Sequence, residues 1–136
     1  MKIKIETLQV TLLENTAPEQ IAVNELPQVT VVELVGDIDT NTAPSVQGQI
    51  LPLAQAGIRM ILEMTKVAYM SSAGLRILLS LYRQISVKGG QIILVGLSEE
   101  IRDTMDNTGF LDFFKTCDTL EQALEVLKVQ VQVTRT

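Results

Sequence analysis

Two adjacent serines, Ser71 and Ser72, stand where the hydrophobic pattern of the chain changes most abruptly. Ile58–Met64 before them is mostly apolar, as in a buried strand, and Leu75–Tyr82 after them repeats apolar residues at the spacing of a helix. A serine at such a junction can cap the helix by accepting a hydrogen bond from a free backbone N–H. The junction therefore places two hydroxyls at the positive end of a helix, and Gly74 lets a neighbouring segment approach closely.

A second polar segment, Gly36–Ala43, directly follows the β-branched run Val29–Val35. Asp, Asn and Thr end strands and cap helices, so a purely local capping role is one interpretation. The other interpretation is that Asp39, Thr40 and Asn41 form a loop that faces a binding partner, since such loops have the same composition. Both interpretations stay open at this point.

Several kinds of catalytic site are excluded by the residue inventory. The chain has no His and one Cys, so it cannot form a Ser-His-Asp or Cys-His arrangement or a thiolate metal cluster. Its glycines form no phosphate-binding motif. Paired acids such as Glu99 and Glu100 at a helix start are typical of solvated capping charges. We therefore expect no catalytic residue, metal or cofactor, but a binding protein whose state another enzyme sets.

Composition and charge indicate a folded protein that does not bind nucleic acid. The chain has 136 residues, 46% hydrophobic and 20% charged, with a net charge of −5, which predicts one domain over residues 1–136 and disfavours phosphate-backbone binding. No apolar run reaches the ~18 residues of a membrane span. Charges in Met1–Glu6 argue against a signal peptide, and the single Cys117, expected in the core, suits a reducing compartment. We therefore expect a cytoplasmic protein without a membrane partner.

The order of predicted elements is β, β, α, β, α, β, α, β, α. Helices between strands imply parallel pairing, whereas the first two strands should pair antiparallel, giving an α/β fold with a mixed, mostly parallel central sheet and about four helices. The predicted segments are strands in 1–13, Val29–Val35, Ile58–Met64, Gln91–Val95 and Phe113–Cys117, and helices in Ala43–Ala56, 72–88, 99–107 and 120–127. Pro52 should kink or split the first helix.

The two ends of the chain lie outside the predicted core of about residues 29–128. Residues 1–28 are expected to form an N-terminal strand followed by a long loop, Asn15–Pro27. Residues 129–136 alternate valine with polar residues and form either a frayed tail or a strand that pairs with residues 2–12. The edges of these two segments also offer surfaces for a homodimer.

The segment Tyr69-Met-Ser-Ser-Ala-Gly-Leu75 resembles the signature of STAS domains, specifically of the anti-sigma factor antagonists. That signature is an Asp-Ser-Ser/Thr-Gly-Leu motif, whose Asp falls here on Ser71, its phosphorylated Ser on Ser72 and its next Ser/Thr on Ala73. Gly36–Asp39 is similar to a second motif of the family, Gly-x-Leu/Ile-Asp. The order of elements also matches the STAS fold.

The resemblance implies regulation by partner switching. Unmodified, the protein would sequester an anti-sigma factor that is itself a Ser/Thr kinase. Phosphorylation of Ser72, or alternatively of Ser71, would end this binding, and a PP2C-type phosphatase would restore it. The residues implied to contact the partner are Asp39, Thr40, Asn41, Met70, Ser71, Ser72, Ala73, Gly74 and Arg76.

Two other functions remain open from the sequence. The chain could be a STAS scaffold subunit of a larger signalling complex that is never phosphorylated, since Ser71 replaces the acidic residue of the family motif. It could also be a small nucleotide-binding α/β protein that uses the loops at the carboxyl ends of its strands. The absence of His and of a phosphate-binding glycine motif disfavours the nucleotide-binding alternative.

Overall fold

The computed structural model describes residues 1–12 and 27–131. The strands are β1 (Lys2–Leu12), β2 (Gln28–Val35), β3 (Arg59–Lys66), β4 (Gln91–Val95), β5 (Lys115–Cys117) and β6 (Val129–Val131). The helices are α1 (Ala43–Ile50), α2 (Ser72–Val87), α3 (Glu99–Asn107) and α4 (Leu120–Val126), with short 3-10 helices at Leu51–Leu53 and Leu111–Phe113. This order of elements confirms the predicted α/β fold.

The strands form one sheet in the order β5-β4-β3-β2-β1-β6. β2, β3, β4 and β5 are mutually parallel, while β1 pairs antiparallel with β2 and with β6. The parallel strands are joined through helices, as short connections cannot reverse the chain within a parallel pair. The carboxyl ends of β2 and β3 consequently lie at the same edge of the sheet.

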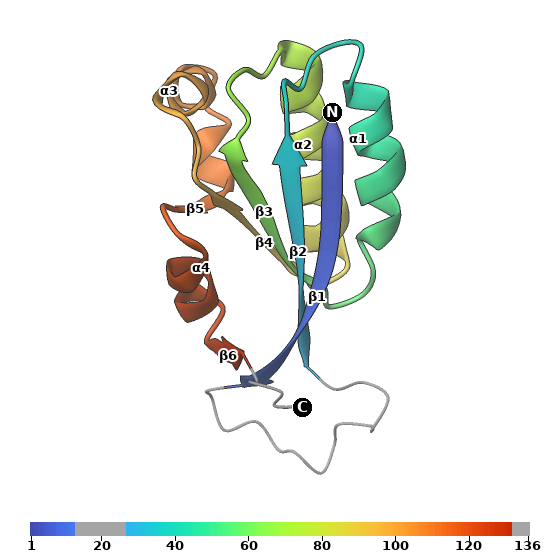
Figure 1. Ribbon diagram of the computed structural model, residues 1–136, viewed down its shortest axis with the longest axis vertical. Coiled ribbons are helices and arrows are strands. Elements are labelled where there is room, and N and C mark those ends of the chain that lie inside the picture. Colours follow the sequence, from blue (N-terminus) through green and yellow to red (C-terminus); the bar gives the residue numbers. More distant parts are fainter. Residues whose placement is uncertain (13–26, 132–136) are drawn as a thin grey trace.

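The two faces of the sheet are covered unequally. Helices α1, α2 and α3 pack on one face around a large apolar core that includes Leu34, Leu62 and Leu78. On the other face α4 covers a smaller cluster with Ile61 and Ala123 at its centre. Figure 1 shows α1 and α2 side by side and α4 apart from them, next to β6. Each apolar strand therefore has side chains buried on both faces, which explains the near-continuous hydrophobic runs of β3 and β4.

Two predicted boundaries and the predicted core position of Cys117 were wrong. The first helix ends at Ile50 rather than Ala56, because Pro52 lies in the 3-10 helix that follows. Phe113 belongs to a 3-10 helix, and the edge strand begins at Lys115. Cys117 is half-buried at the margin of the smaller cluster rather than fully buried in the core.

The open question about the C-terminal segment is answered for Val129–Val131, and residues 132–136 lie outside the described residues. Val129–Val131 forms a strand that pairs with Val10–Leu12, so these two segments are hydrogen-bonded to each other within one chain. The predicted loop Asn15–Pro27 lies, except for Pro27, outside the described residues. Among the described helices, none combines the length and the apolar character that crossing a bilayer requires.

Candidate functional site

The loops that follow β2 and β3 are hydrogen-bonded side by side. The Ile38 N–H donates to the Tyr69 carbonyl over 3.0 Å, and the Ser71 N–H donates to the Ile38 carbonyl over 2.8 Å. These bonds extend the parallel pairing of the two strands by one isolated bridge, Ile38 to Met70. The structure thus brings the Asp39 segment and the two serines together at one edge of the sheet.

Close packing of Gly74 fixes the first turn of α2 against both loops. A Cβ atom at Gly74 would lie 2.5 Å from Met70 Cγ, 2.8 Å from Ile38 Cγ2 and 3.1 Å from the Ile38 carbonyl oxygen. Real Cβ atoms do not approach neighbours so closely, and the Ile38 oxygen belongs to the backbone. The absence of a side chain at Gly74 therefore allows α2 to begin directly on top of the loop.

The two serines have different environments. Ser71 is the N-cap of α2: its Oγ accepts from the Gly74 N–H over 3.4 Å, and its carbonyl accepts from the Leu75 N–H over 3.0 Å. Ser72 is the first residue of the helix and is exposed. Within the described residues its hydroxyl has no hydrogen-bond partner. Ser71 thus carries out the capping, and the Ser72 hydroxyl is left free to react.

Asp39 organises its own loop. Its Oδ1 accepts from the backbone N–H groups of Thr42 and Asn41 over 3.0 and 2.9 Å, and from the Thr42 hydroxyl over 3.3 Å. The Thr42 N–H first of all, together with the other donors, lowers the pKa of Asp39 below its ordinary value and outweighs the opposing effect of desolvation. Asp39 is therefore a carboxylate at neutral pH, with Oδ1 committed to the loop.

The expected contact residues divide into surface and support. Thr40, Asn41, Ser72 and Arg76 are exposed, and Asp39, Ser71 and Ala73 are partly exposed. Met70 and Gly74, in contrast, are buried. A partner could not contact these two without rearrangement, so in this structure they support the loop rather than present a surface.

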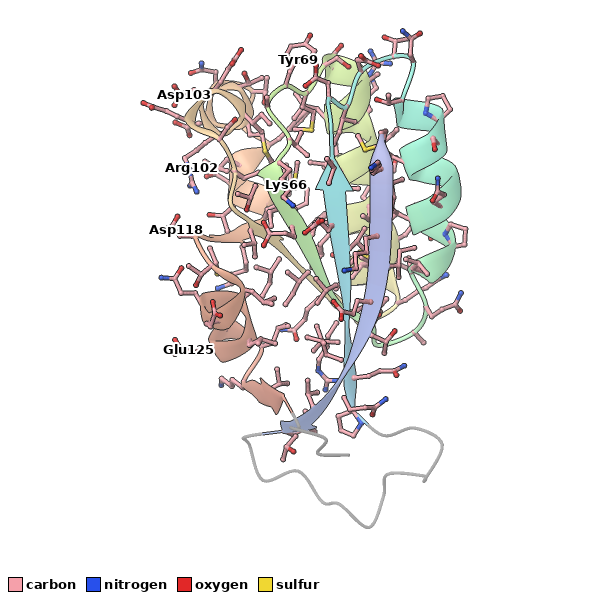
Figure 2. All side chains as sticks on the ribbon, in the orientation of Figure 1. Lys66, Tyr69, Arg102, Asp103, Asp118 and Glu125 are labelled. Atoms are coloured by element: carbon pink, nitrogen blue, oxygen red, sulfur yellow. The ribbon has the colours of Figure 1, made fainter. Side chains whose placement is uncertain are left out.

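Tyr69 is a surface residue that the sequence did not single out as a contact. It is 47% exposed although it is large and partly apolar, and it directly precedes Met70 in the loop. Figure 2 shows Tyr69 at the top of the molecule, beyond Lys66 at the end of β3. Exposed tyrosines are frequent anchors in protein interfaces. The position of Tyr69 close to the two serines in the sequence could have indicated that it is a contact residue.

The site is an exposed, mostly polar surface. Among the described residues, no group of three or more His, Cys, Asp or Glu side chains is arranged to hold a metal ion. The chemistry that the geometry offers is modification of the free Ser72 hydroxyl, at the positive end of α2. Around it, the exposed side chains are suited to contacts with another protein.

Comparison with known proteins identifies relatives of this chain. The family model described as the STAS domain matches residues 20–123. The anti-sigma-B factor antagonist of Bacillus subtilis (strain 168) is 32% identical over 81 residues, which cover 60% of this chain and 74% of that protein.

Solved structures share the fold. A crystal structure of an anti-sigma factor antagonist from Mycobacterium paratuberculosis is 25% identical, with a TM-score of 0.61, and the match covers 90% of this chain and 93% of that one. The unphosphorylated form of the anti-sigma factor antagonist SpoIIAA is 19% identical, with a TM-score of 0.61 and coverage of 73% and 87%. A phosphorylated form of SpoIIAA from Bacillus matches with a TM-score of 0.56, 19% identity and coverage of 73% and 90%.

Proposed function

Since the chain belongs to the STAS domain family, we propose that it is an anti-sigma factor antagonist, a binding protein rather than an enzyme. It would bind an anti-sigma factor in the cytoplasm and thereby release a sigma factor. Its relatives carry this name in Bacillus subtilis and in Mycobacterium paratuberculosis. The observation that carries the proposal is the free, exposed Ser72 hydroxyl beside the Asp39 loop.

The regulation that fits this site is phosphorylation of Ser72 by the partner itself. The anti-sigma factor would be a Ser/Thr kinase, and a PP2C-type phosphatase would remove the phosphate. A phosphorylated form exists for SpoIIAA, which has the same fold. Of the two serines, Ser72 is the better acceptor, because the Ser71 hydroxyl already accepts the Gly74 N–H.

Electrostatics make such a switch act on the interface rather than on the fold. A phosphate adds ~−1.5 to −2 charges at pH 7. The first turn of α2 contains no acidic residue, so within this helix the added charge meets the favourable end of the helix dipole. The unfavourable effect then falls on a partner that must desolvate or repel the dianion.

The surface that would contact the kinase surrounds Ser72. We assign direct contact to the exposed members of the site, with Tyr69 as an apolar anchor and Met70 and Gly74 as support beneath them. The residues in direct contact would be Asp39, Thr40, Asn41, Tyr69, Ser71, Ser72, Ala73 and Arg76.

The test is phosphate incorporation followed on a phosphate-retarding gel. The purified protein is incubated with ATP alone and with ATP plus lysate of the native host. Ser71→Ala and Ser72→Ala are compared with Ser45→Ala, which removes an exposed serine from the first turn of α1. We expect a retarded band that requires lysate, persists in Ser45→Ala and Ser71→Ala, and disappears in Ser72→Ala. Loss of the band in Ser71→Ala alone would move the acceptor to Ser71.

One alternative has a specific observation in its favour. Ser71 occupies the position where the family motif has an acidic residue, which leaves room for a STAS scaffold subunit that is never phosphorylated. In that case no lane would show a retarded band, even though the same lysate phosphorylates a known substrate of the kinase.

A further inference from the structure

Within the part of the chain that the structure describes, the outer edge of β1 is paired only at Val10–Leu12. Over Lys2–Gln9 its inner edge pairs with β2, while β6 covers the outer edge only at Val10–Leu12. No other strand in the described part of the chain pairs with the outer edge of Lys2–Gln9. Figure 1 shows β1 running the length of the sheet, with β6 at its lower end.

The hydrogen-bonding direction along this edge follows from one bond. The Val10 N–H donates to the Pro27 carbonyl over 3.2 Å, so Val10 directs its backbone groups toward β2. Direction alternates along an antiparallel strand, and the β1–β2 register is continuous from Lys2 to Gln9. The even-numbered residues therefore bond to β2, and Ile3, Ile5, Thr7 and Gln9 direct their N–H and C=O groups outward.

We propose that a second copy of this chain pairs with this edge, antiparallel, with Ile5 of one copy opposite Ile5 of the other. In this register the outward-directed residues of the two copies are hydrogen-bonded pairs, as the alternation requires. Lys4 then lies opposite Glu6 of the other copy, and the symmetry repeats this opposite-charge pair. Both pairs fall at non-hydrogen-bonded positions, where cross-strand side chains approach most closely.

Each neighbouring register places a pair of like charges at its centre. The pairing must keep odd-numbered residues of one copy opposite odd-numbered residues of the other, so the register can shift only in steps that preserve this parity. One such shift places Lys4 opposite Lys4 of the other copy at the centre, although it also brings Lys2 opposite Glu6 on either side. The opposite shift places Glu6 opposite Glu6 and brings Lys2 against Val10, where β6 already pairs. Charges usually keep an edge strand from pairing, but among these three registers only the one with Ile5 opposite Ile5 has opposite-charge pairs and no like-charge pair.

Ile5 adds an apolar contact at the centre of the pair. Its side chain is 43% exposed, unusual for isoleucine in a strand, and pairing would cover it with its own symmetry mate. An edge-to-edge contact of this length buries less area than a stable dimer interface, so association should be weak and concentration-dependent.

The paired residues, 1–9, include none of the residues assigned to the Ser72 site. Because the two β1 strands run in opposite directions, the carboxyl ends of β2 and β3 in the two copies point toward opposite ends of the joined sheet. The dimer would therefore carry one partner-binding site toward each end of that sheet. The inference does not depend on the proposed function, which a monomer could perform equally.

Sedimentation velocity of the full chain over a wide concentration range tests the pairing. Three samples are compared with the unaltered protein: Lys4→Glu, Glu6→Lys, and an equimolar mixture of the two. Each variant alone places like charges opposite each other twice, so we expect its concentration-dependent increase in sedimentation coefficient to be lost. In the mixture, one chain carries two carboxylates at positions 4 and 6, and these face two lysines at positions 6 and 4 of the other chain, so the increase should return.

Glu6→Lys also serves as its own control. It brings the net charge of −5 closer to zero, so loss of its dimer cannot come from general repulsion. It lies opposite Val31, whereas Lys4 lies opposite Glu33, so it is the safer variant for folding, and thermal melts verify both. A protein that stays monomeric at every concentration, a dimer that persists in both variants, or a mixture that fails to associate would each overturn the proposal.

Discussion

Ser71 and Ser72 are neighbours in the chain, but the first caps α2 and the second is the proposed phosphate acceptor. Both hydroxyls stand at the start of α2, but Ser71 is outside the helix in extended conformation and can turn its Oγ toward the Gly74 N–H. Ser72 is the first helical residue, and its side chain is exposed on the first turn. The capping role and the proposed acceptor role therefore belong to different residues.

At the residue scale, Gly74→Ala should destabilise the protein, with Gly48→Ala as its matched control. The new Cβ at Gly74 meets Met70 Cγ and the Ile38 backbone, so we expect a loss of roughly 1–3 kcal/mol in the free energy of unfolding. Gly48 lies within α1, where an added Cβ would have nothing within 4 Å, and alanine there should stabilise by about 0.5–1 kcal/mol. Urea denaturation of both variants measures the two changes.

The interpretation of Gly74 is specific because both substitutions add the same methyl group to a helix. If the free energy of unfolding falls in Gly74→Ala and rises in Gly48→Ala, the loss at Gly74 comes from the contact with Ile38 rather than from adding a methyl group to a helix. If Gly74→Ala proved as harmless as Gly48→Ala, the loop would be loosely packed on α2.

The lowered pKa of Asp39 predicts a pH dependence that one variant can isolate. A carboxylate with a depressed pKa stabilises the folded state above its ordinary value of 3.8, and this stabilisation is lost as pH falls through the lower folded value. Asp39→Asn keeps an acceptor oxygen but removes the charge. The difference in unfolding free energy between the two proteins should be constant near neutral pH and shrink as pH falls below the ordinary value of 3.8. Urea titrations at several pH values measure it, and a constant difference throughout would contradict the assignment.

At the scale of elements, periodicity predicted the fold, and its failures have local causes. The apolar runs of β2, β3 and β4 and the spacing in α2 were sufficient to give the order of elements and the mixed sheet. In the loop after β3 the expected contact residue Met70 is buried and Tyr69 is exposed instead, because a bridge to Ile38 sets the orientation of the loop there. The pairing of β6 with β1 depends on contacts between the two ends of the chain, which local patterns cannot specify.

The capping box of α4 gives a prediction for one element. Thr119 Oγ1 accepts from the Gln122 N–H over 3.2 Å, and Gln122 Oε1 accepts from the Thr119 N–H over 3.3 Å. Thr119→Ala should therefore cost about 1 kcal/mol of stability. Because α4 packs on the face of the sheet opposite to α2, binding of the anti-sigma factor should not change.

A second threonine provides the comparison for Thr119. The Thr104 hydroxyl donates to the Glu100 carbonyl inside α3 and caps nothing. Thr104→Ala should leave stability unchanged or slightly raise it, since alanine has the higher helix propensity. Chemical denaturation and partner-binding titrations distinguish the two, and equal losses in both variants would remove the special role of the cap.

At the scale of the whole molecule, the site is built where two sequence-distant segments meet at one edge of a rigid sheet. The Asp39 loop and the Ser71 loop each leave a central parallel strand, and backbone hydrogen bonds hold them together before any partner arrives. A preorganised surface of this kind loses little conformational freedom on binding. The proximity of the two loops follows from the order of the strands. The burial of Met70 and Gly74 depends on how α2 packs on the loops, which the sequence alone does not show.

The same rigidity predicts that phosphorylation changes binding without changing the fold. Ser72 is exposed and contacts no acidic residue in its own turn, so the phosphorylated protein should melt within a few degrees of the unmodified protein. Affinity for the anti-sigma factor should fall by several kcal/mol, on the order of a charge left buried or opposed in an interface. Calorimetric melting and titration of the two forms against the same partner measure both quantities. A large drop in melting temperature on phosphorylation would contradict this prediction. It would mean that the phosphate unfolds the first turn of α2 and that this unfolding removes the partner surface.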